Sequence, residues 1–276
     1  METGLLVKAD ERLAGIRCLN DNQLKLIAAI CMLIDHVTKV FYQSLALRVI
    51  NPMLASGRLT SKVFLRYRWI YDPLLCGIGA VAFPIFAFAF TEGFAHTRSK
   101  GKFLGRLLIF ALISELPFDL TFFSGFSQDS LFYWNHQNVF FTFAIALGSL
   151  WLMELAGKIK WKPLAVIAQC IAALLACCLA EFVVYNDYGG YGVFFIIVAY
   201  LTRKNRLVQA LAMLAAKYLF DWYNYPVSFL ISLVLILLYN GKRGEKNLKK
   251  FFYWFYPAHI AVIGLVNWLI FYVPWR

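Results

Sequence analysis

The stretch LKLIAAICMLIDHVTKVFYQSL, residues 24–45, decides how this chain folds. It is apolar over most of its length, and about 20 such residues in an α-helix cross the hydrocarbon core of a bilayer. It nevertheless contains Lys25, Asp35 and His36. An ionisable group inside hydrocarbon is costly unless it is paired, and such groups mark functional sites. The stretch therefore predicts a transmembrane helix that carries part of a site.

The composition of the whole chain agrees with this interpretation. Hydrophobic residues make up 61% of the 276 residues and charged residues only 15%, and the mean hydropathy is +0.65. Soluble domains average about 45–50% apolar and about 25% charged residues. Neither a soluble globule nor a disordered chain has such a composition. We therefore expect a polytopic membrane protein in contact with the lipid bilayer.

Eight further apolar runs follow the first. They cover residues 74–95, 103–123, 138–156, 163–184, 189–202, 206–221, 226–240 and 251–272. These runs predict an all-α helical bundle with about nine transmembrane helices, within a range of eight to ten. Little chain remains for a separate soluble domain, so residues 1–276 form a single membrane domain. The sixth and seventh runs are short, which is typical of tilted, re-entrant or protein-buried helices.

Basic residues are divided unevenly between the loops on the two sides of this bundle. Eighteen fall in one set of segments and six in the other, and cytoplasmic loops carry the excess of Lys and Arg. The richer set consists of segments 8–17, 98–106, 158–162, 203–206 and 242–250. The N-terminal segment 1–23 is therefore predicted to be cytoplasmic. Segment 46–72 is basic although it falls outside, and predicts a loop, an interfacial helix or another crossing.

The same topology signal explains the net charge of +12, so no nucleic-acid partner is expected. The six cysteines lie mostly in apolar runs and form no CxxC pair. This pattern favours small core residues over a disulfide framework or a metal site.

The loops predicted to face outward differ from the basic ones. Segments 128–138, 185–191 and 221–225 contain no Lys or Arg, but they are rich in Asp, Asn and aromatic residues. One interpretation is an interfacial aromatic belt. The other is an acceptor-binding mouth, whose candidate residues are Trp134, Asn138, Asp187 and Tyr188.

His36 on the first run and Glu115 on the third are expected at similar depth. Lys25 and His36 are eleven residues apart, so they share one helix face and are separated by roughly 16 Å along the axis. Glu115 and Asp119, at i and i+4 around Pro117, share a face of the third run. They form either a proton relay with His36 or an interhelical ion pair.

Two further groups complete the candidate site. His259 lies about nine residues in from Lys250, at a depth where it could meet His36. At the cytoplasmic ends of the second and third runs, polar and basic residues gather near Lys25, and they indicate topology or contact with a phosphorylated donor. These residues are Glu92, His96, Arg98, Lys100 and Arg106.

Six sequence blocks together resemble the conjugal-transfer TraX family. They are LKLIAAICMLIDH, FPIFAFAFTEGFAHT, LLIFALISELPFD, NVFFTFAIAL, DYGGYGV and FYPAHIAVI, which come in that family's order from about residue 24 to 263. The family is similar to the acyltransferase-3 membrane acyltransferases. Those proteins carry a basic residue, ten intervening residues and a histidine on the first span, and Lys25 and His36 fit this spacing.

The resemblance implies a multi-pass acetyltransferase of the bacterial cytoplasmic (inner) membrane. It would move an acetyl group from cytosolic acetyl-CoA to an amine or hydroxyl of a pilin-like peptide or an envelope glycan. His36 would be the base or a transient acyl carrier, supported by Asp35, Glu115, Asp119 or His259. Lys25 and the basic group near it would hold the CoA phosphates. The oligomeric state stays open.

Two alternatives from other classes remain. One is a secondary transporter with an intramembrane carboxylate proton path, although no internal repeat is visible in the sequence. The other is a non-catalytic membrane assembly factor, which has no need for a histidine at a particular depth.

The loop charges give a testable topology. A cysteine introduced as Lys246→Cys should resist a membrane-impermeant thiol reagent in intact cells, whereas Asn135→Cys should react. Permeabilised cells should allow both to react. Labelling of Lys246→Cys from outside would contradict the orientation.

Overall fold

The computed structural model describes residues 2–63, 65–66, 77–123, 133–220 and 225–273. Within these ranges the regular elements are helices, joined by two isolated β-bridges, Leu19 with Tyr239 and Gln137 with Asn186. The prediction of an all-α fold is therefore confirmed. The helices before residue 100 are α1 (Glu2–Ala14), α2 (Asp21–Leu45), η1 (Ala46–Ile50), α3 (Asn51–Ala55), α5 (Gly77–Gly79) and α6 (Ala82–His96).

The second half of the chain continues in the same way. Its helices are α7 (Lys100–Phe122), α8 (Val139–Ala156), α9 (Lys162–Leu179), η3 (Ala180–Val184), α10 (Gly189–Leu201), α11 (Arg206–Phe220), α12 (Pro226–Leu237) and α13 (Lys249–Phe271). Four helical segments of the described chain are long and apolar enough to cross a membrane: Gly77–His96, Val139–Ala156, Lys162–Val184 and Lys249–Phe271. They indicate a membrane protein. The count of nine crossings and the orientation remain predictions.

Helix α2 begins at a capping box. The Asn20 side chain accepts a hydrogen bond from the Gln23 backbone N–H at 3.0 Å, and the Gln23 side chain accepts one from the Asn20 N–H at 2.9 Å. Two of the otherwise unpaired N–H groups are thereby satisfied. At its other end α2 does not stop, because η1 and α3 continue it to Ala55. The first part of the basic segment 46–72 is thus helical, while residues 64 and 67–72 lie outside the described residues.

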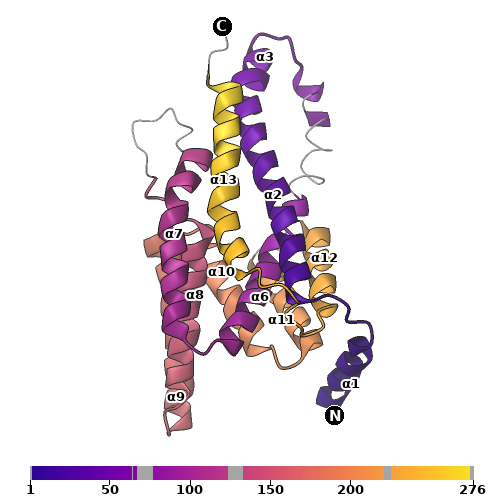
Figure 1. The fold of residues 1–276 in the computed structure, drawn as a ribbon, viewed down its shortest axis with the longest axis vertical. Helices are drawn as coiled ribbons and strands as arrows, with labels where there is room; N and C mark the ends of the chain where they lie inside the picture. Colours follow the sequence, from indigo (N-terminus) through magenta and orange to yellow (C-terminus); the bar gives the residue numbers. More distant parts are fainter. Residues whose placement is uncertain (1, 64, 67–76, 124–132, 221–224, 274–276) are drawn as a thin grey trace.

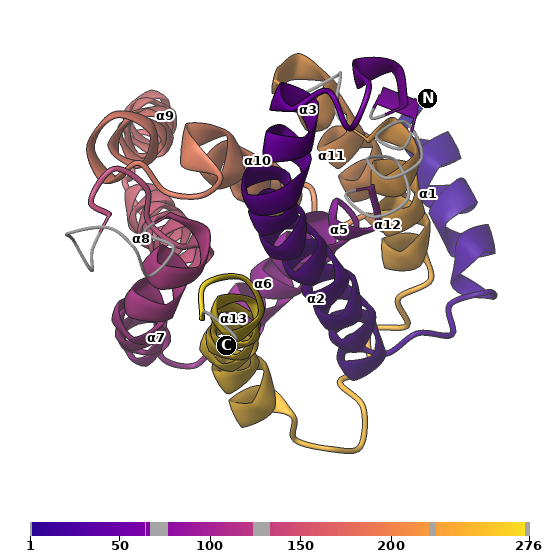
Figure 2. The ribbon, with the colours of Figure 1, turned by 90° about the horizontal axis from the view of Figure 1, so that it is seen from above.

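Helices α2, α7 and α13 form the part of the fold that positions the site. All three run in the same direction along the long axis, and α13 packs against both α7 and α2 (Figures 1 and 2). On the far sides, α8 packs between α7 and α9, and α2 packs on α6. Residues equally far along α2, α7 and α13 therefore lie at similar heights.

The loop before α13 brings the starts of α13 and α2 together. The Asp21 backbone N–H donates to the Lys242 carbonyl at 2.9 Å, and the Asn22 side chain donates to the Lys246 carbonyl at 2.7 Å. These bonds satisfy polar groups at the first turn of α2. The basic residues at the beginnings of the two helices are consequently neighbours.

Helices α7 and α13 approach closely at Gly264. A Cβ atom there would overlap the Thr121 hydroxyl oxygen, and Thr121 in turn donates a hydrogen bond to the Ile260 carbonyl at 3.2 Å. Small residues at such crossings let helix backbones approach in a membrane. This contact lies one helical turn beyond His259 on α13.

We expect Gly264→Ala to destabilise the protein by about 1–3 kcal/mol, because the added methyl group overpacks this crossing. Combining it with Thr121→Ala should recover part of the loss, since the overlapping oxygen is removed. Gly148→Ala on α8 is the matched control, because no atom lies within 4 Å of its added Cβ. Thermal unfolding in detergent measures all four proteins, and equal melting temperatures for the Gly264 and Gly148 variants would contradict the packing argument.

Candidate functional site

Two histidines from opposite ends of the chain, a half-buried His36 and a buried His259, meet between α2 and α13. His36 Nδ1 and His259 Nε2 are 2.8 Å apart, and the two ring planes lie within 9° of each other. The centroids are 5.0 Å apart, which is longer than the 3.5–4.0 Å of faces in contact. The rings therefore meet edge to edge through their nitrogens, in nearly one plane.

Aromatic side chains surround this histidine pair. The ring of Phe255 stacks on His259 with centroids 4.6 Å apart, and the Phe255 carbonyl lies 2.6 Å from His259 Nδ1. Phe122 and Tyr256 contact His36 edge-on at 5.2 and 6.2 Å. Neither imidazole can move far without displacing one of these rings. The site is rigid because packed side chains hold it.

The Asp35 carboxylate is turned to a partner other than His36. Lys39 Nζ lies 2.7 Å from it, one turn along α2. Asp35 is buried against α5, where a Cβ on Gly79 would overlap the carboxylate. Only glycine permits this approach. The predicted support of His36 by Asp35 therefore lacks a direct hydrogen bond among the described residues.

The two carboxylates of α7 hold the segment that precedes α8. The Asn138 side-chain amide donates to Glu115 and, at 2.8 Å, to the Ala111 carbonyl. Asp119 accepts a hydrogen bond at 2.9 Å from the Tyr133 backbone N–H. Both carboxylates therefore bond to the segment before α8, and neither has a hydrogen bond to the histidine pair among the described residues.

A pocket of about 520 Å³ lies where this segment meets the 185–189 turn. His136, Glu181, Asp187 and Tyr188 line it, and its described lining contains no Lys or Arg. His136 Nε2 lies 3.3 Å from the Asp187 carboxylate. Tyr185, also in the lining, has a left-handed backbone with φ of 51°, a conformation that non-glycine residues rarely adopt.

The predicted acceptor-binding residues thus occupy three environments. Asp187 and Tyr188 line the pocket, and Tyr188 also stacks on Phe83 with centroids 3.7 Å apart. Trp134 is 78% exposed in the adjacent segment. Asn138 is fully buried, and its side-chain oxygen caps α8 by accepting from the Phe140 N–H at 3.0 Å. Their role in acceptor binding stays a prediction.

Basic residues from α2, α7, α13 and the loop before α13 lie near the N-terminal ends of α2 and α13. The positive charges of Arg106, Arg243 and Lys25 all act on the Lys249 ammonium. Lys25 also pairs with Asp21 at 2.7 Å. We call Lys25, Arg106, Arg243 and Lys249 the basic cluster. Sequence reasoning selected Lys25 and Arg106 as binding residues but counted the other two only as topology signals.

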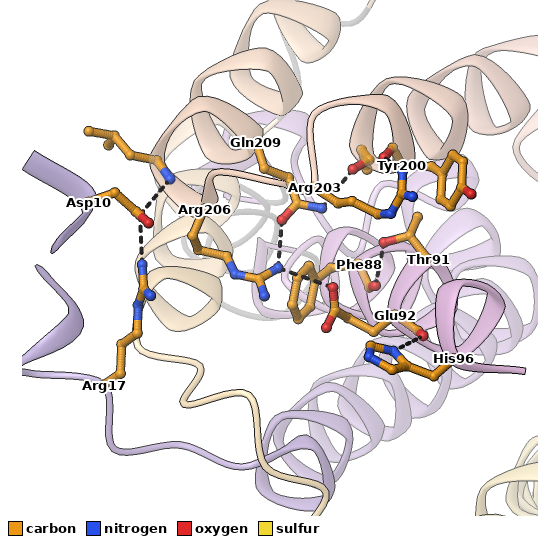
Figure 3. A network of polar contacts seen from close by, with 12 residues as sticks. Asp10, Arg17, Phe88, Thr91, Glu92, His96, Tyr200, Arg203, Arg206 and Gln209 are labelled. Carbon is orange, nitrogen blue, oxygen red and sulfur yellow. Dashed lines mark hydrogen bonds and ion pairs between the residues drawn. The ribbon is translucent and has the colours of Figure 1, made fainter. Parts of the chain in front are cut away.

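The other predicted donor-binding residues have partners elsewhere. Glu92 lies 3.4 Å from Arg206, whose guanidinium covers the ring of Phe88 and donates to Gln209 at 2.7 Å (Figure 3). His96 Nδ1 donates to the Glu92 carbonyl at 2.8 Å (Figure 3). This network joins α6 to α11.

Lys100 and Arg98 are also apart from the basic cluster. Lys100 pairs with Glu154 of α8 and lies over the ring of Phe94, and Arg98 is exposed. The donor-binding role of Glu92, His96, Arg98 and Lys100 therefore stays a prediction, and no polar contact within the described part of the chain joins them to Lys25.

Beside this network, polar contacts hold the N-terminal helix α1 against α11. Asp10 of α1 accepts a hydrogen bond from the Leu207 backbone N–H of α11 at 3.0 Å and pairs with Arg17 at 2.6 Å (Figure 3). A carboxylate at the first turn of a helix is stabilised by the helix dipole.

These features place the chain among polytopic helical membrane proteins that hold ionisable groups between their helices. More narrowly, it belongs to the TraX protein family, whose sequence profile matches residues 20–267. It is 30% identical over 260 residues to a Dichelobacter nodosus protein named "Probable fimbrial assembly protein FimC, serogroup H1". That alignment covers 87% of this chain and 93% of the relative. No solved structure matches the chain.

The contacts of Asn138 lead to a stability prediction. Asn138→Asp keeps the cap on Phe140 but replaces the amide donor with an oxygen that faces Glu115 and the Ala111 carbonyl. We expect a loss of about 1–3 kcal/mol, because a buried acceptor then lacks its donor. Adding Glu115→Gln restores a donor and should recover part of the loss. An unchanged melting temperature for Asn138→Asp would show that this bridge carries little stability.

Proposed function

We propose that the chain is an integral-membrane acetyltransferase of the bacterial inner membrane. It moves an acetyl group from cytosolic acetyl-CoA to an amine or hydroxyl of a membrane or extracytoplasmic acceptor. The observation that carries the proposal is the arrangement of α2. Its first turns join the basic cluster through Lys25, and eleven residues later His36 meets the buried imidazole of His259.

The basic cluster would bind the phosphates of acetyl-CoA, the acyl donor. The nucleotide of acetyl-CoA is too highly charged to enter hydrocarbon, so its phosphates stay at the membrane surface. Arg and Lys form strong, charge-assisted hydrogen bonds to phosphate, and the basic cluster brings together such residues from α2, α7, α13 and the loop before α13. The slender pantetheine arm then has to bridge roughly 16 Å along α2 to reach His36.

The chemistry requires only groups that the chain and its two substrates provide. His36 Nε2 takes the proton from the acceptor N–H or O–H while the acceptor attacks the thioester carbonyl carbon. A C–N or C–O bond forms and the C–S bond breaks. The CoA thiolate leaves and receives the proton from His36. A transient acetyl-His36 is the two-step version of the same transfer.

The pocket beside Asp187 and Tyr188 supports approach of the acceptor from the other end. An acceptor held there meets the acetyl group part-way through the membrane. The acetyl group crosses, while CoA stays on the cytosolic side.

A second candidate, a non-catalytic assembly factor for surface fibres, is favoured by one finding. The Dichelobacter relative is named as a fimbrial assembly protein. Its name specifies no chemistry. The two candidates therefore differ in whether acetyl-CoA binds and in whether the envelope carries an acetyl group that depends on this protein.

The acetyltransferase proposal is tested with purified protein in nanodiscs and with whole envelopes. Wild type should bind labelled acetyl-CoA, and mass spectrometry should find an acetylated envelope component that disappears with the gene. His36→Ala should still bind acetyl-CoA but lower transfer by roughly 10²–10⁴-fold, because the base is lost. Absence of both binding and acetylation would favour the assembly factor.

Substitutions of single cations inside and outside the basic cluster show whether acetyl-CoA affinity depends on that cluster or on net charge alone. Lys25→Ala and Arg106→Ala should each weaken acetyl-CoA binding by roughly tenfold, the loss expected for one charge-assisted hydrogen bond. Lys25→Arg should be milder, since phosphate accepts either cation. Lys160→Ala, an exposed lysine between α8 and α9, is the control. If Lys160→Ala weakened acetyl-CoA binding equally, the effect would be due to net charge and the basic cluster would not be the phosphate site.

A further inference from the structure

We infer that His259 is a positioning residue that fixes His36 in one tautomer, with Nδ1 protonated and Nε2 unprotonated. The geometric part of this inference is independent of any activity, and its consequence for turnover rests on the proposed function. The two hydrogen bonds of His259 carry it.

The first step concerns the proton on His259. Its Nδ1 lies 2.6 Å from the Phe255 carbonyl oxygen. A carbonyl has no proton to give and acts only as an acceptor. His259 Nδ1 must therefore carry a hydrogen, and in a neutral imidazole the other nitrogen, Nε2, then presents a lone pair.

The second step determines which nitrogen of His36 carries the proton. His259 Nε2 is the atom that lies 2.8 Å from His36 Nδ1, in nearly coplanar rings. Because Nε2 is the acceptor, His36 Nδ1 must be the donor. The lone pair of His36 is thereby placed on Nε2, the nitrogen on the far side of the ring from His259.

The same contacts decide which of the two histidines can act as the base. If their roles were exchanged, His259 would need a free nitrogen to act as the base, but both of its nitrogens are engaged. Stacking on Phe255 and burial to 7% exposure prevent the His259 ring from turning over. His36 is thus the member of the pair that can exchange a proton with a substrate.

The arrangement has the logic of a catalytic triad with a neutral third member. In serine proteases a buried aspartate accepts from histidine Nδ1, which sets the tautomer and stabilises the imidazolium that forms. Here an imidazole does so, and the nearby carboxylate of Asp35 is already paired with Lys39. A neutral acceptor places no permanent charge beside hydrocarbon, where charge is costly.

The direct test is nitrogen NMR of the protein labelled with ¹⁵N-histidine, in nanodiscs without substrate. The signals of His36, assigned by their loss in His36→Gln, should show a protonated Nδ1 and an unprotonated Nε2. The His259 signals should show a protonated Nδ1 as well. A proton on His36 Nε2 in the neutral protein would overturn the inference, whether or not acetyl transfer is found.

Two substitutions at His259 test the consequence. His259→Phe keeps a ring but removes the acceptor, so the His36 tautomer should no longer be fixed, and kcat should fall roughly 10²-fold or more with KM for acetyl-CoA unchanged. His259→Gln places an amide oxygen near the former Nε2 and should restore both the tautomer and most of kcat.

The outcomes separate the inference from the proposed function. Full kcat in His259→Phe would overturn the positioning role even if wild type transfers acetyl groups. If wild type transfers none, the proposed function fails while the NMR result still decides the tautomer. If His259→Phe does not fold, the wild-type spectrum and His259→Gln remain as tests.

Discussion

The hydrocarbon core of a membrane offers no water to an ionisable side chain, so each such group must find its partner inside the protein. The described residues meet this requirement in pairs. His36 bonds His259, Asp35 bonds Lys39, and Glu115 bonds Asn138. The first of these bonds joins helices that are 223 residues apart in sequence. Of the three pairs this one alone includes a residue of α13, so it adds a polar contact to the packing of α13 on α2.

The three helices share a spacing that links their two ends. On α2, α7 and α13 a basic residue of the cluster precedes an ionisable group of the site by nine to eleven residues: Lys25 before His36, Arg106 before Glu115, and Lys249 before His259. Because the helices are parallel in chain direction (Figure 1), equal spacing yields two levels, one basic and one polar. Proline lies two residues from the polar group on two of them, Pro117 and Pro257, where it loosens backbone bonding next to the site.

The sequence predicts where the helices lie along the chain, but it does not predict which side chains of different helices contact each other. Apolar runs at 138–156 and 251–272 correspond to α8 (Val139–Ala156) and α13 (Lys249–Phe271), because helix length in a bilayer is set by local composition. Residue spacing also places His36 and His259 at similar depth. It cannot show which nitrogen faces which, or that Glu92 pairs with Arg206 and Lys100 with Glu154. Those contacts depend on how distant helices pack, which no local pattern encodes.

The length of the helix that begins at Asp21 has a consequence of its own. Together α2, η1 and α3 span thirty-five residues, or about 52 Å, against roughly 30 Å of hydrocarbon. A helix of this length must either tilt or extend beyond the hydrocarbon at one end. In its last part the Arg48 guanidinium lies over the ring of Tyr272, the residue that follows α13. The positive charge of Arg48 thus has an aromatic partner within the protein.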